Sequence, residues 1–304
     1  MNARPLPPFI ELIYTKNPLQ KKMIQNFLVS RDDLYWKRLQ EFNDSYLPYL
    51  ASQGANTETV VKGYLKLCDD MLREQINFQK TGRYSSADLD ETNRLIYSQT
   101  DRMSALLHGL AISQFLWPNH YGLFDFFISQ CSQLQNVNSY LEVGPGHGLF
   151  LLEILRLFPK VKATVVDISP TAIQISKGAV EKLRPGSSCE FVIQDVNAMK
   201  EGVYDLVTMC EVLEHLDDPV PILQKARSLI TTGGHCFITT CANAPAIDHV
   251  YLYKSVEEIQ DQLQECGFQI DAELALPVGR VRREHWTSEK TEINYAALLS
   301  RGRS

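Results

Sequence analysis

The sequence lacks several features that would at once assign a chain to a class of protein. Its 304 residues contain no apolar run approaching about 18 residues, so no transmembrane helix is expected. The first residues, MNARPLPPFIELIYTKN, hold no compact apolar stretch ahead of a small-residue cleavage site, so no signal peptide is expected. Internal repeats and low-complexity tracts are also missing. These absences predict a globular cytoplasmic protein without a membrane partner.

Cysteine and positive charge are present, but not in amounts or patterns that indicate a special class. The seven cysteines are odd in number and include no C-x-x-C pair, which argues against a disulfide framework or a zinc knuckle. Lys and Arg number 30 against 36 Asp and Glu, giving a formal net charge of -6. That excess of negative charge argues against binding to nucleic acid through a broad positively charged surface.

The first part of the chain reads as helical. Apolar residues recur at helix-like spacing over residues 17–42, 57–79 and about 87–116, and the last segment ends before Pro118. Asn56 or Thr57 is placed to cap the second segment, and residues 80–91 form a polar linker. We expect residues 1–135 to form a helical N-terminal cap or lid domain that ends in the polar run SQLQNVNS.

From Ser139 onward the pattern changes to short apolar runs that alternate with amphipathic stretches. This alternation predicts an α/β fold, with a Rossmann-like, doubly wound sheet of seven strands over residues 136–304. The expected strands are 139–143, 162–168, 189–195, 204–212, 233–241, 268–276 and 293–301, and the expected helices are 149–158, 171–183, 219–230 and 256–267. No convincing helix separates the last two strands, so we expect a terminal antiparallel hairpin.

A glycine turn, G-P-G-H-G over residues 144–148, follows the first expected strand and precedes a helix. Glycine lets the backbone turn sharply and approach a ligand closely, and a helix start offers free N–H groups. Its third glycine comes one residue earlier than in the dinucleotide fingerprint. Asp167 and Asp195 end the next two expected strands, so the turn and both carboxylates should meet at the carboxyl edge of the sheet, where open parallel sheets bind ligands. His147 is expected to be a packing residue of the turn.

Five segments together carry a resemblance to a known family. They are LEVGPGHG, VVDIS, VIQDVNAM, YDLVTMCEVLEHLDDP and LITTGGHCFITT. In this combination the C-terminal part of the chain resembles a class I S-adenosylmethionine-dependent methyltransferase. The resemblance covers roughly residues 135–304 and implies S-adenosyl-L-methionine as the cofactor.

The resemblance also implies a position for each part of the cofactor. Its amino-acid moiety would lie around Glu142, Gly144, Pro145, Gly146 and Gly148. The ribose would meet Asp167, the adenine would lie beside Ile168, Asp195 and Val196, and the methyl-donor side would face Cys210 and Glu211. Because the sulfonium is already electrophilic, the protein supplies binding, positioning and, for some substrates, a base.

The motif E-x-x-E-H, formed by Glu211, Glu214 and His215, carries a narrower resemblance. With the later His249 it is similar to ubiquinone-pathway O-methyltransferases and to small-RNA 3′-terminal methyltransferases. There, such a set can hold a divalent metal that orients neighbouring substrate oxygens. The sequence leaves three interpretations open: a metal site, a catalytic acid/base role for His215 with Glu214, and a structural role.

An aromatic segment, FLWPNHYGLFDFF, precedes the first expected strand. It could fold over the cofactor and shape an apolar acceptor pocket, in which case Trp117, Asn119, His120 and Tyr121 would contact substrate. Packing at the junction of the two domains is the other interpretation. The long helical part would equally suit a lid, a homodimer interface or a dock for a carrier protein.

These observations predict an enzyme that methylates a small-molecule metabolite or natural-product intermediate, on oxygen, nitrogen or carbon. Two alternatives stay open at this point. An RNA 3′-terminal ribose methyltransferase would need a basic groove, which the acidic balance disfavours. A non-catalytic cofactor-binding subunit would have no need of the complete set of Asp167, Asp195 and E-x-x-E-H.

Overall fold

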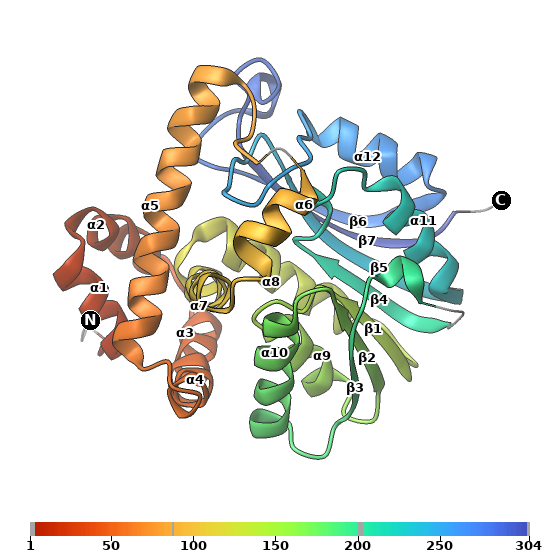
Figure 1. The fold of residues 1–304 in the computed structure, drawn as a ribbon, viewed down its shortest axis with the longest axis horizontal. Coiled ribbons are helices and arrows are strands. Elements are labelled where there is room, and N and C mark those ends of the chain that lie inside the picture. The colour runs from red at the N-terminus through yellow and green to blue at the C-terminus, as the bar shows by residue number, and fades with distance from the viewer. Residues whose placement is uncertain (1–3, 87, 200–202, 303–304) are drawn as a thin grey trace.

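The chain is helical up to residue 131, where its apolar residues have helical spacing. From residue 139 onward, the short apolar runs form the strands of a sheet, with helices between them. The computed structural model describes residues 4–86, 88–199 and 203–302. Helices α1 to α5 lie beside the sheet, and α6, α7 and α8 lie between these helices and the strands (Figure 1). The helices of the first part are α1 (Pro8–Lys16), α2 (Pro18–Leu28), α3 (Asp33–Glu41), α4 (Leu47–Ser52), α5 (Thr57–Thr81), α6 (Leu89–Thr92), α7 (Thr100–Leu116) and α8 (Pro118–Cys131).

Two of the expected long helices are broken into shorter ones. The segment 17–42 forms α2 and α3, because the Asp32 carboxylate accepts from the Tyr35 N–H (2.8 Å) and starts a new helix. The segment expected from about residue 87 forms α6, a π-helical turn (Asn93–Tyr97) and α7, with Gln99 extended before α7. Its expected start, Ala87, lies outside the described residues. Asn56 caps α5 as predicted, through the Thr59 N–H (3.0 Å).

The predicted seven-stranded sheet is confirmed, with strand order β3-β2-β1-β4-β5-β7-β6. Its strands are β1 (Ser139–Val143), β2 (Lys162–Asp167), β3 (Ser188–Ile193), β4 (Tyr204–Cys210), β5 (Ile230–Ala242), β6 (Phe268–Pro277) and β7 (Ile293–Arg301). The first five pair in parallel, while β7 pairs antiparallel with both β5 and β6. The expected hairpin therefore forms, and its second strand lies inside the sheet rather than at the edge.

Alternating side chains give the sheet two apolar faces. Tyr140 and Phe237 point to the face covered by α8, α9 (Leu149–Leu157) and α10 (Pro170–Leu183). Leu141 and Ile238, their neighbours in sequence, point to the face covered by α11 (Val220–Leu229) and α12 (Val256–Glu265). This period of two is the one expected of strands buried on both sides.

The helical part and the sheet share one hydrophobic cluster. Phe115 of α7 and Phe127 of α8 belong to the same cluster as Phe150 of α9 and Phe237 of β5. The Phe127 ring lies 4.9 Å from that of Phe150 and 5.0 Å from that of Phe237, both in edge-on contact. The division of the chain near residue 135 stays a prediction. Within the described ranges, no helix combines the length and hydropathy needed to cross a bilayer.

Helices α5 and α7 touch backbone to backbone where two glycines meet. A Cβ on Gly63 would lie 2.6 Å from the Ala105 carbonyl oxygen, and one on Gly109 would lie 3.0 Å from the Gly63 carbonyl oxygen. Glycine at both positions lets α7 approach α5 closely.

We predict that Gly63→Ala lowers the free energy of unfolding by about 2 kcal/mol, because a contact of 2.6 Å with a backbone oxygen puts the overpacking cost at about 3 kcal/mol, against a gain in helix propensity of about 1 kcal/mol. The exposed neighbour Lys62 provides the control. Chemical denaturation of Lys62→Ala should give wild-type stability. If Gly63→Ala were as stable as wild type, α5 and α7 could move apart without loss of stability, which would contradict the prediction.

Candidate functional site

The glycine turn adopts a backbone that only glycine takes easily. Gly144, Gly146 and Gly148 have φ values of 71°, 50° and 78°. The Gly144 N–H donates to the Val166 carbonyl (2.9 Å), which fixes the turn to β2. A Cβ on Gly144 would approach the Val212 side chain to 2.8 Å, so this position has no room for a larger residue.

A cavity of about 470 Å³ opens beside this turn, at the carboxyl ends of the parallel strands. Most of the residues predicted to bind the cofactor line it. They are Glu142, Gly144, Pro145, Gly146, Asp167, Ile168, Asp195, Val196, Cys210 and Glu211. Gly148 does not line the cavity but precedes α9 as its N-cap residue. The structure therefore brings the turn and the two carboxylates together at one edge of the sheet.

Glu142 is a buried carboxyl that lines the cavity. Its Oε2 accepts a hydrogen bond from the Tyr140 hydroxyl (2.9 Å), which also lies 2.6 Å from Thr208 Oγ1. Burial raises the pKa of Glu142 to about 8, against the opposing effect of the Tyr140 hydrogen bond. A buried acid of this kind is stabilised by a proton or by a cationic ligand group.

Asp167 and Asp195 each bind the backbone through one oxygen. Asp167 Oδ1 accepts from the Ser169 N–H (2.7 Å), and Asp195 Oδ1 accepts from the Asn197 N–H (2.8 Å). Burial raises the pKa of Asp167 to about 6, although backbone N–H groups oppose the shift. Asp195 lies two residues beyond the end of β3, on the exposed rim. The second oxygen of each carboxylate can accept from a ligand hydroxyl or amine.

The E-x-x-E-H motif lies directly after β4, in a strained turn. Glu211 has a φ of 54°, and a short 3₁₀ helix (Leu213–His215) follows it. Glu214 is fully buried and does not line the cavity. Its Oε2 accepts from Thr240 Oγ1 (2.7 Å) and its carbonyl accepts from the N–H groups of Val250 (2.8 Å) and Tyr251 (3.0 Å). Glu214 thereby holds the loop after β5 against the end of β4.

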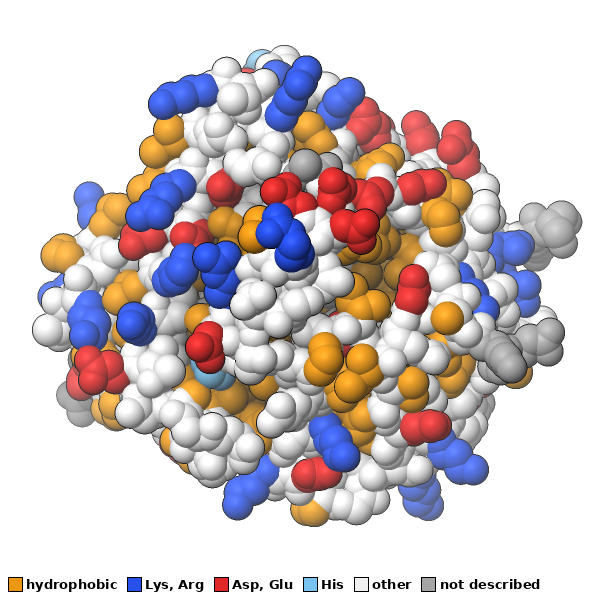
Figure 2. Space-filling model, in the orientation of Figure 1, with side chains coloured by type: hydrophobic (Ala, Val, Ile, Leu, Met, Phe, Trp, Pro, Cys, Tyr) orange, Lys and Arg blue, Asp and Glu red, His pale blue; other side chains and the backbone are white. Residues whose placement is uncertain are grey.

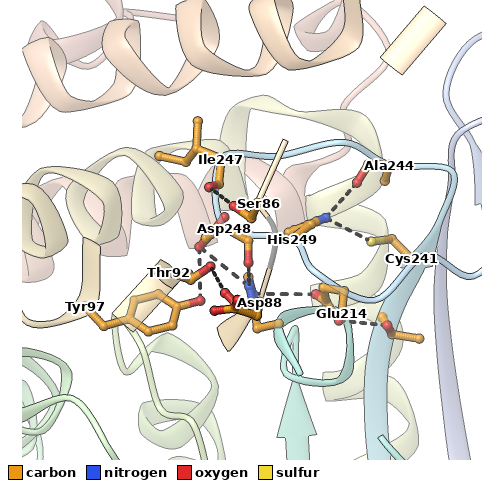
Figure 3. Close-up of polar contacts among 12 residues, drawn as sticks. Ser86, Asp88, Thr92, Tyr97, Glu214, Cys241, Ala244, Ile247, Asp248 and His249 are labelled. Carbon is orange, nitrogen blue, oxygen red and sulfur yellow. Dashed lines mark hydrogen bonds and ion pairs between the residues drawn. The ribbon is translucent and has the colours of Figure 1, made fainter. Parts of the chain in front are cut away.

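His215 and His249 approach each other across this loop, and their ring centres lie 5.0 Å apart. His215 Nδ1 lies 2.9 Å from the Asp248 carbonyl oxygen, and His249 Nδ1 lies 2.6 Å from that of Ala244. Figure 3 shows the loop residues Ala244, Ile247, Asp248 and His249 close to Glu214. Burial, with a further effect of the His215 charge, lowers the pKa of His249 to about 4.

The donor groups of this loop fit a divalent cation. Among the described residues, no donor group reaches the buried Oε1 atoms of Glu211 and Glu214. Ligand atoms lie within 4.8 Å of one another in two groups of three, Glu214 with Cys241 and His249, and His215 with Asp248 and His249. Of the four predicted metal ligands, Glu214, His215 and His249 thus lie in such groups, while Glu211 lies in neither. Mixed nitrogen, oxygen and sulfur donors suit a transition metal or zinc.

The wall opposite the sheet comes from the helical part and is mostly apolar. Its lining includes Leu67, Met71, Met103, Leu106, Leu107, Leu110 and Trp117. Of the four residues predicted to contact substrate, Trp117 and His120 line the cavity. Asn119 and Tyr121 do not. The Asn119 amide donates to the Leu276 carbonyl (2.9 Å), and the Tyr121 ring packs edge-on against Tyr35.

Sequence reasoning missed several polar residues of the lining, and three of them lie on the glycine turn and at the start of β7. His147, expected only to pack, lines the cavity from the glycine turn, and its carbonyl accepts from the buried Tyr46 hydroxyl (2.6 Å). Glu292 and Asn294 line it from the start of β7. They stand two residues apart, the spacing of one strand face, but nothing in the sequence shows that β7 pairs next to β5.

Comparisons with known proteins agree with this geometry. A family model described as "Methyltransferase domain" matches residues 141–236. A ubiquinone biosynthesis O-methyltransferase of Xanthomonas euvesicatoria pv. vesicatoria is 27% identical over 179 residues, which cover 52% of this chain and 73% of the relative. A malonyl-[acyl-carrier protein] O-methyltransferase of Ilyobacter polytropus is 35% identical over 104 residues, which cover 34% of this chain and only 38% of the relative.

The fold also resembles that of solved structures. An O-methyltransferase family protein from Burkholderia thailandensis superposes with a TM-score of 0.52 at 14% identity, covering 81% of this chain and 72% of that one. The mitomycin 7-O-methyltransferase MmcR gives a TM-score of 0.51 at 12% identity, covering 75% of this chain and 67% of that one. At these identities the likeness concerns the fold, including the helical part before the sheet.

We predict that stability falls between pH 6.5 and pH 8, and that Glu142→Gln reduces the fall. The folded pKa of about 8 lies above the unfolded value of 4.5, so the folded state binds more protons and loses stability as pH rises. One such group contributes about 1 kcal/mol per pH unit. The buried histidines have lowered pKa values in the folded state, so they make stability rise with pH, but only up to about pH 6.5. They do not account for a change above that pH.

Chemical denaturation at pH 6.5 and pH 8 measures this slope. Glu190→Gln, at an exposed position of β3, is the control and should keep the wild-type slope. An unchanged slope in Glu142→Gln would mean that Glu142 is ionised in the folded protein throughout this range.

Proposed function

Because the chain belongs to the class I S-adenosylmethionine-dependent methyltransferases, we propose that it methylates a small molecule with an apolar body. The observation that carries this proposal is the joint lining of one cavity. The glycine turn, Asp167 and Asp195 line one side, and the apolar side chains of α7 line the other. A cofactor on the first side would present its reacting end to an acceptor held on the second.

Different residues on the sheet side would bind different parts of the cofactor. When bound, S-adenosylmethionine supplies a methyl group that is already electrophilic, because it is attached to a sulfonium. We propose that Glu142 pairs with the ammonium of its amino-acid moiety, near the N–H groups of the glycine turn. Asp167 would accept from the ribose hydroxyls, and Asp195 from the adenine amine. Ile168 and Val196 would flank the adenine, while Cys210 and Glu211 lie at the methyl-donor end.

The helical part would cap the acceptor and exclude water. The segment before α7 is fastened to the loops of the sheet edge, since Ser86 Oγ donates to the Ile247 carbonyl (2.6 Å) and the Leu89 N–H donates to Asp217 Oδ1 (3.1 Å). Removing water strengthens polar interactions within the cavity and protects the reacting groups. We therefore propose that residues 1–135 act as a cap on the methyltransferase domain.

The charge at the cavity mouth favours a free small molecule over a phosphate-bearing acceptor. Asp217 and Asp218 are exposed and line the cavity, and Asp88 and Asp90 lie exposed at α6. Figure 2 shows acidic side chains gathered beside a hollow lined by hydrophobic ones. An RNA backbone or a phosphate-linked carrier arm would meet like charge there. The free cysteines fit the cytoplasm as the place of this reaction.

We propose that a divalent cation is held by Glu214, His215, Asp248 and His249. When bound it would polarise an oxygen of the acceptor as a Lewis acid. Glu214 and His215 then serve as ligands and as supports of the loop after β5, with the unpartnered Glu214 Oε1 satisfied by the cation. Methyl transfer to oxygen is the form of the reaction that uses such a site.

Asp167→Asn is expected to weaken the binding of S-adenosylhomocysteine about 10- to 100-fold, because hydrogen bonds to a charged group contribute about 1.5–3 kcal/mol. Isothermal titration calorimetry measures the change. Glu190→Gln on the neighbouring strand is the matched control and should bind like wild type. Equal affinity in Asp167→Asn would place the ribose elsewhere.

Incubation with methyl-labelled S-adenosylmethionine and a cell extract should place label in the small-molecule fraction. EDTA should reduce the label at least about 10-fold, as loss of metal support does at such sites, and added Mg²⁺, Mn²⁺ or Zn²⁺ should restore it. Label in the RNA or protein fraction would contradict the proposed acceptor class. Transfer that is indifferent to EDTA would leave Glu214 and His215 with a structural role.

A further inference from the structure

The ring of His120 is held in one tautomer by its neighbour on α7. Ser113 Oγ donates to the Leu110 carbonyl (2.8 Å), which can only accept, so the single hydroxyl proton is used there. The same Oγ lies 2.9 Å from His120 Nδ1. Both contacts are satisfied only when Nδ1 carries a proton and donates to Ser113. His120 Nε2 then holds a free lone pair.

The position of this ring is fixed from several sides. The Trp117 indole packs against it at 4.8 Å between centres, and the Gln114 amide donates to the His120 backbone carbonyl. The preceding residue, Asn119, donates to the carbonyl of Leu276 and to Asn294 Oδ1 (both 2.9 Å). These contacts tie the first turn of α8 to α7, β6 and β7. A ring held in this way presents Nε2 in a constant direction.

His120 lies between the two sides of the cavity. It lines the cavity, and within the described chain its Nε2 makes no hydrogen bond. A positive charge on His120 lowers the pKa of His147 in the glycine turn, and a positive charge on His249 lowers the pKa of His120. His120 is therefore within electrostatic reach of both the cofactor side and the loop after β5.

The surroundings keep this nitrogen a neutral acceptor. Burial lowers the pKa of His120 to about 4, so the ring is uncharged near pH 7. Apolar side chains of α7, Leu106, Leu107 and Leu110, line the same wall. The Asn294 amide, whose oxygen is occupied by Asn119, adds a donor beside them. A neutral acceptor and one amide donor at an apolar wall fit a hydroxyl on an apolar body, such as a phenol.

We infer that His120 Nε2 binds the hydroxyl of the methyl acceptor and takes its proton during transfer, with Ser113 as the residue that fixes the tautomer. This inference rests on the proposed function and names the acceptor class for the same cavity. It differs from the role considered for His215, whose Nε2 faces the Glu214 carboxylate at 3.9 Å.

The step balances in atoms and charge. The acceptor O–H bond breaks as the proton bonds to His120 Nε2, and the oxygen bonds to the methyl carbon. The methyl–sulfur bond breaks, and its electron pair stays on sulfur as a neutral thioether. One positive charge thus leaves the sulfonium and one appears on the imidazolium, so the total charge of the cavity is unchanged. Because the total charge is conserved, a weakly basic imidazole can accept the proton. The sulfonium cation, which opposes protonation of the ring, becomes neutral in the same step.

Imidazole ¹⁵N NMR of the full chain tests the inference without turnover. With S-adenosylhomocysteine bound at pH 7.5, His120 should show a protonated Nδ1 and an unprotonated Nε2. Adding phenol as the probe should shift the Nε2 resonance, and the Trp117 indole signals report that phenol is in the cavity. The opposite tautomer would overturn the inference. Phenol at Trp117 without a change at Nε2, or no phenol binding, would overturn it as well.

Two variants test the role of Ser113 against a control. Ser113→Ala should give a mixture of His120 tautomers and reduce the phenol-induced shift, because the acceptor for Nδ1–H is lost. His235→Gln, on β5 and outside the lining, controls for loss of a ring and should leave that shift unchanged.

Single-turnover transfer to the acceptor found in the extract gives the kinetic test. His120→Gln should be slower by about 100-fold, the smaller end of general-base contributions, with unchanged affinity for S-adenosylhomocysteine. A rate within threefold of wild type would overturn the role in proton transfer. Failure of the wild-type chain to bind S-adenosylhomocysteine would instead count against the proposed function itself.

Discussion

The hydrogen bond from the Tyr46 hydroxyl to the His147 carbonyl is the constraint on which much of the site depends. That carbonyl belongs to a glycine turn, where regular secondary structure does not supply a partner, and a buried carbonyl needs one. Tyr49, one turn further on, donates in the same way to the Ile175 carbonyl of α10 (2.7 Å). The helical part therefore fixes the turn and the helix behind it, and the two walls of the cavity keep a set spacing.

Removal of water from this space acts in opposite directions on its acids and bases. It raises the pKa values of Glu142 and Asp167 and lowers those of His120 and His147, so each group is driven toward its neutral form. A cationic ligand would favour the charged form of the buried carboxyls, because its charge replaces the water that they have lost. Electrostatic interactions with such a ligand are strong because little water screens them.

The sheet and the ligand-binding role of its carboxyl edge could be predicted from the sequence, because both follow from local patterns. Short apolar runs located every strand, and the glycine turn with Asp167 and Asp195 located the cavity. The π-helical turn ahead of α7 was not predicted, because the spacing of apolar residues does not distinguish it from an α-helix. The contact of Ser113 with His120 was not predicted either, nor were Glu292 and Asn294. Their positions depend on how α7 meets α8 and on where β7 enters the sheet, which are contacts between distant parts of the chain.

The placement of β7 has a consequence for the order of assembly. As the last strand in the sequence, it fills the gap between β5 and β6 and pairs with both. Until residues 293–301 have been synthesised, β5 has an open hydrogen-bonding edge and β6 has no partner. The glycine turn and the first five strands can form earlier on the ribosome, but the wall carrying Asn294 is completed only by the final strand. A nascent chain would thus complete the wall at Asn294 last, with an unpaired strand edge in the interval.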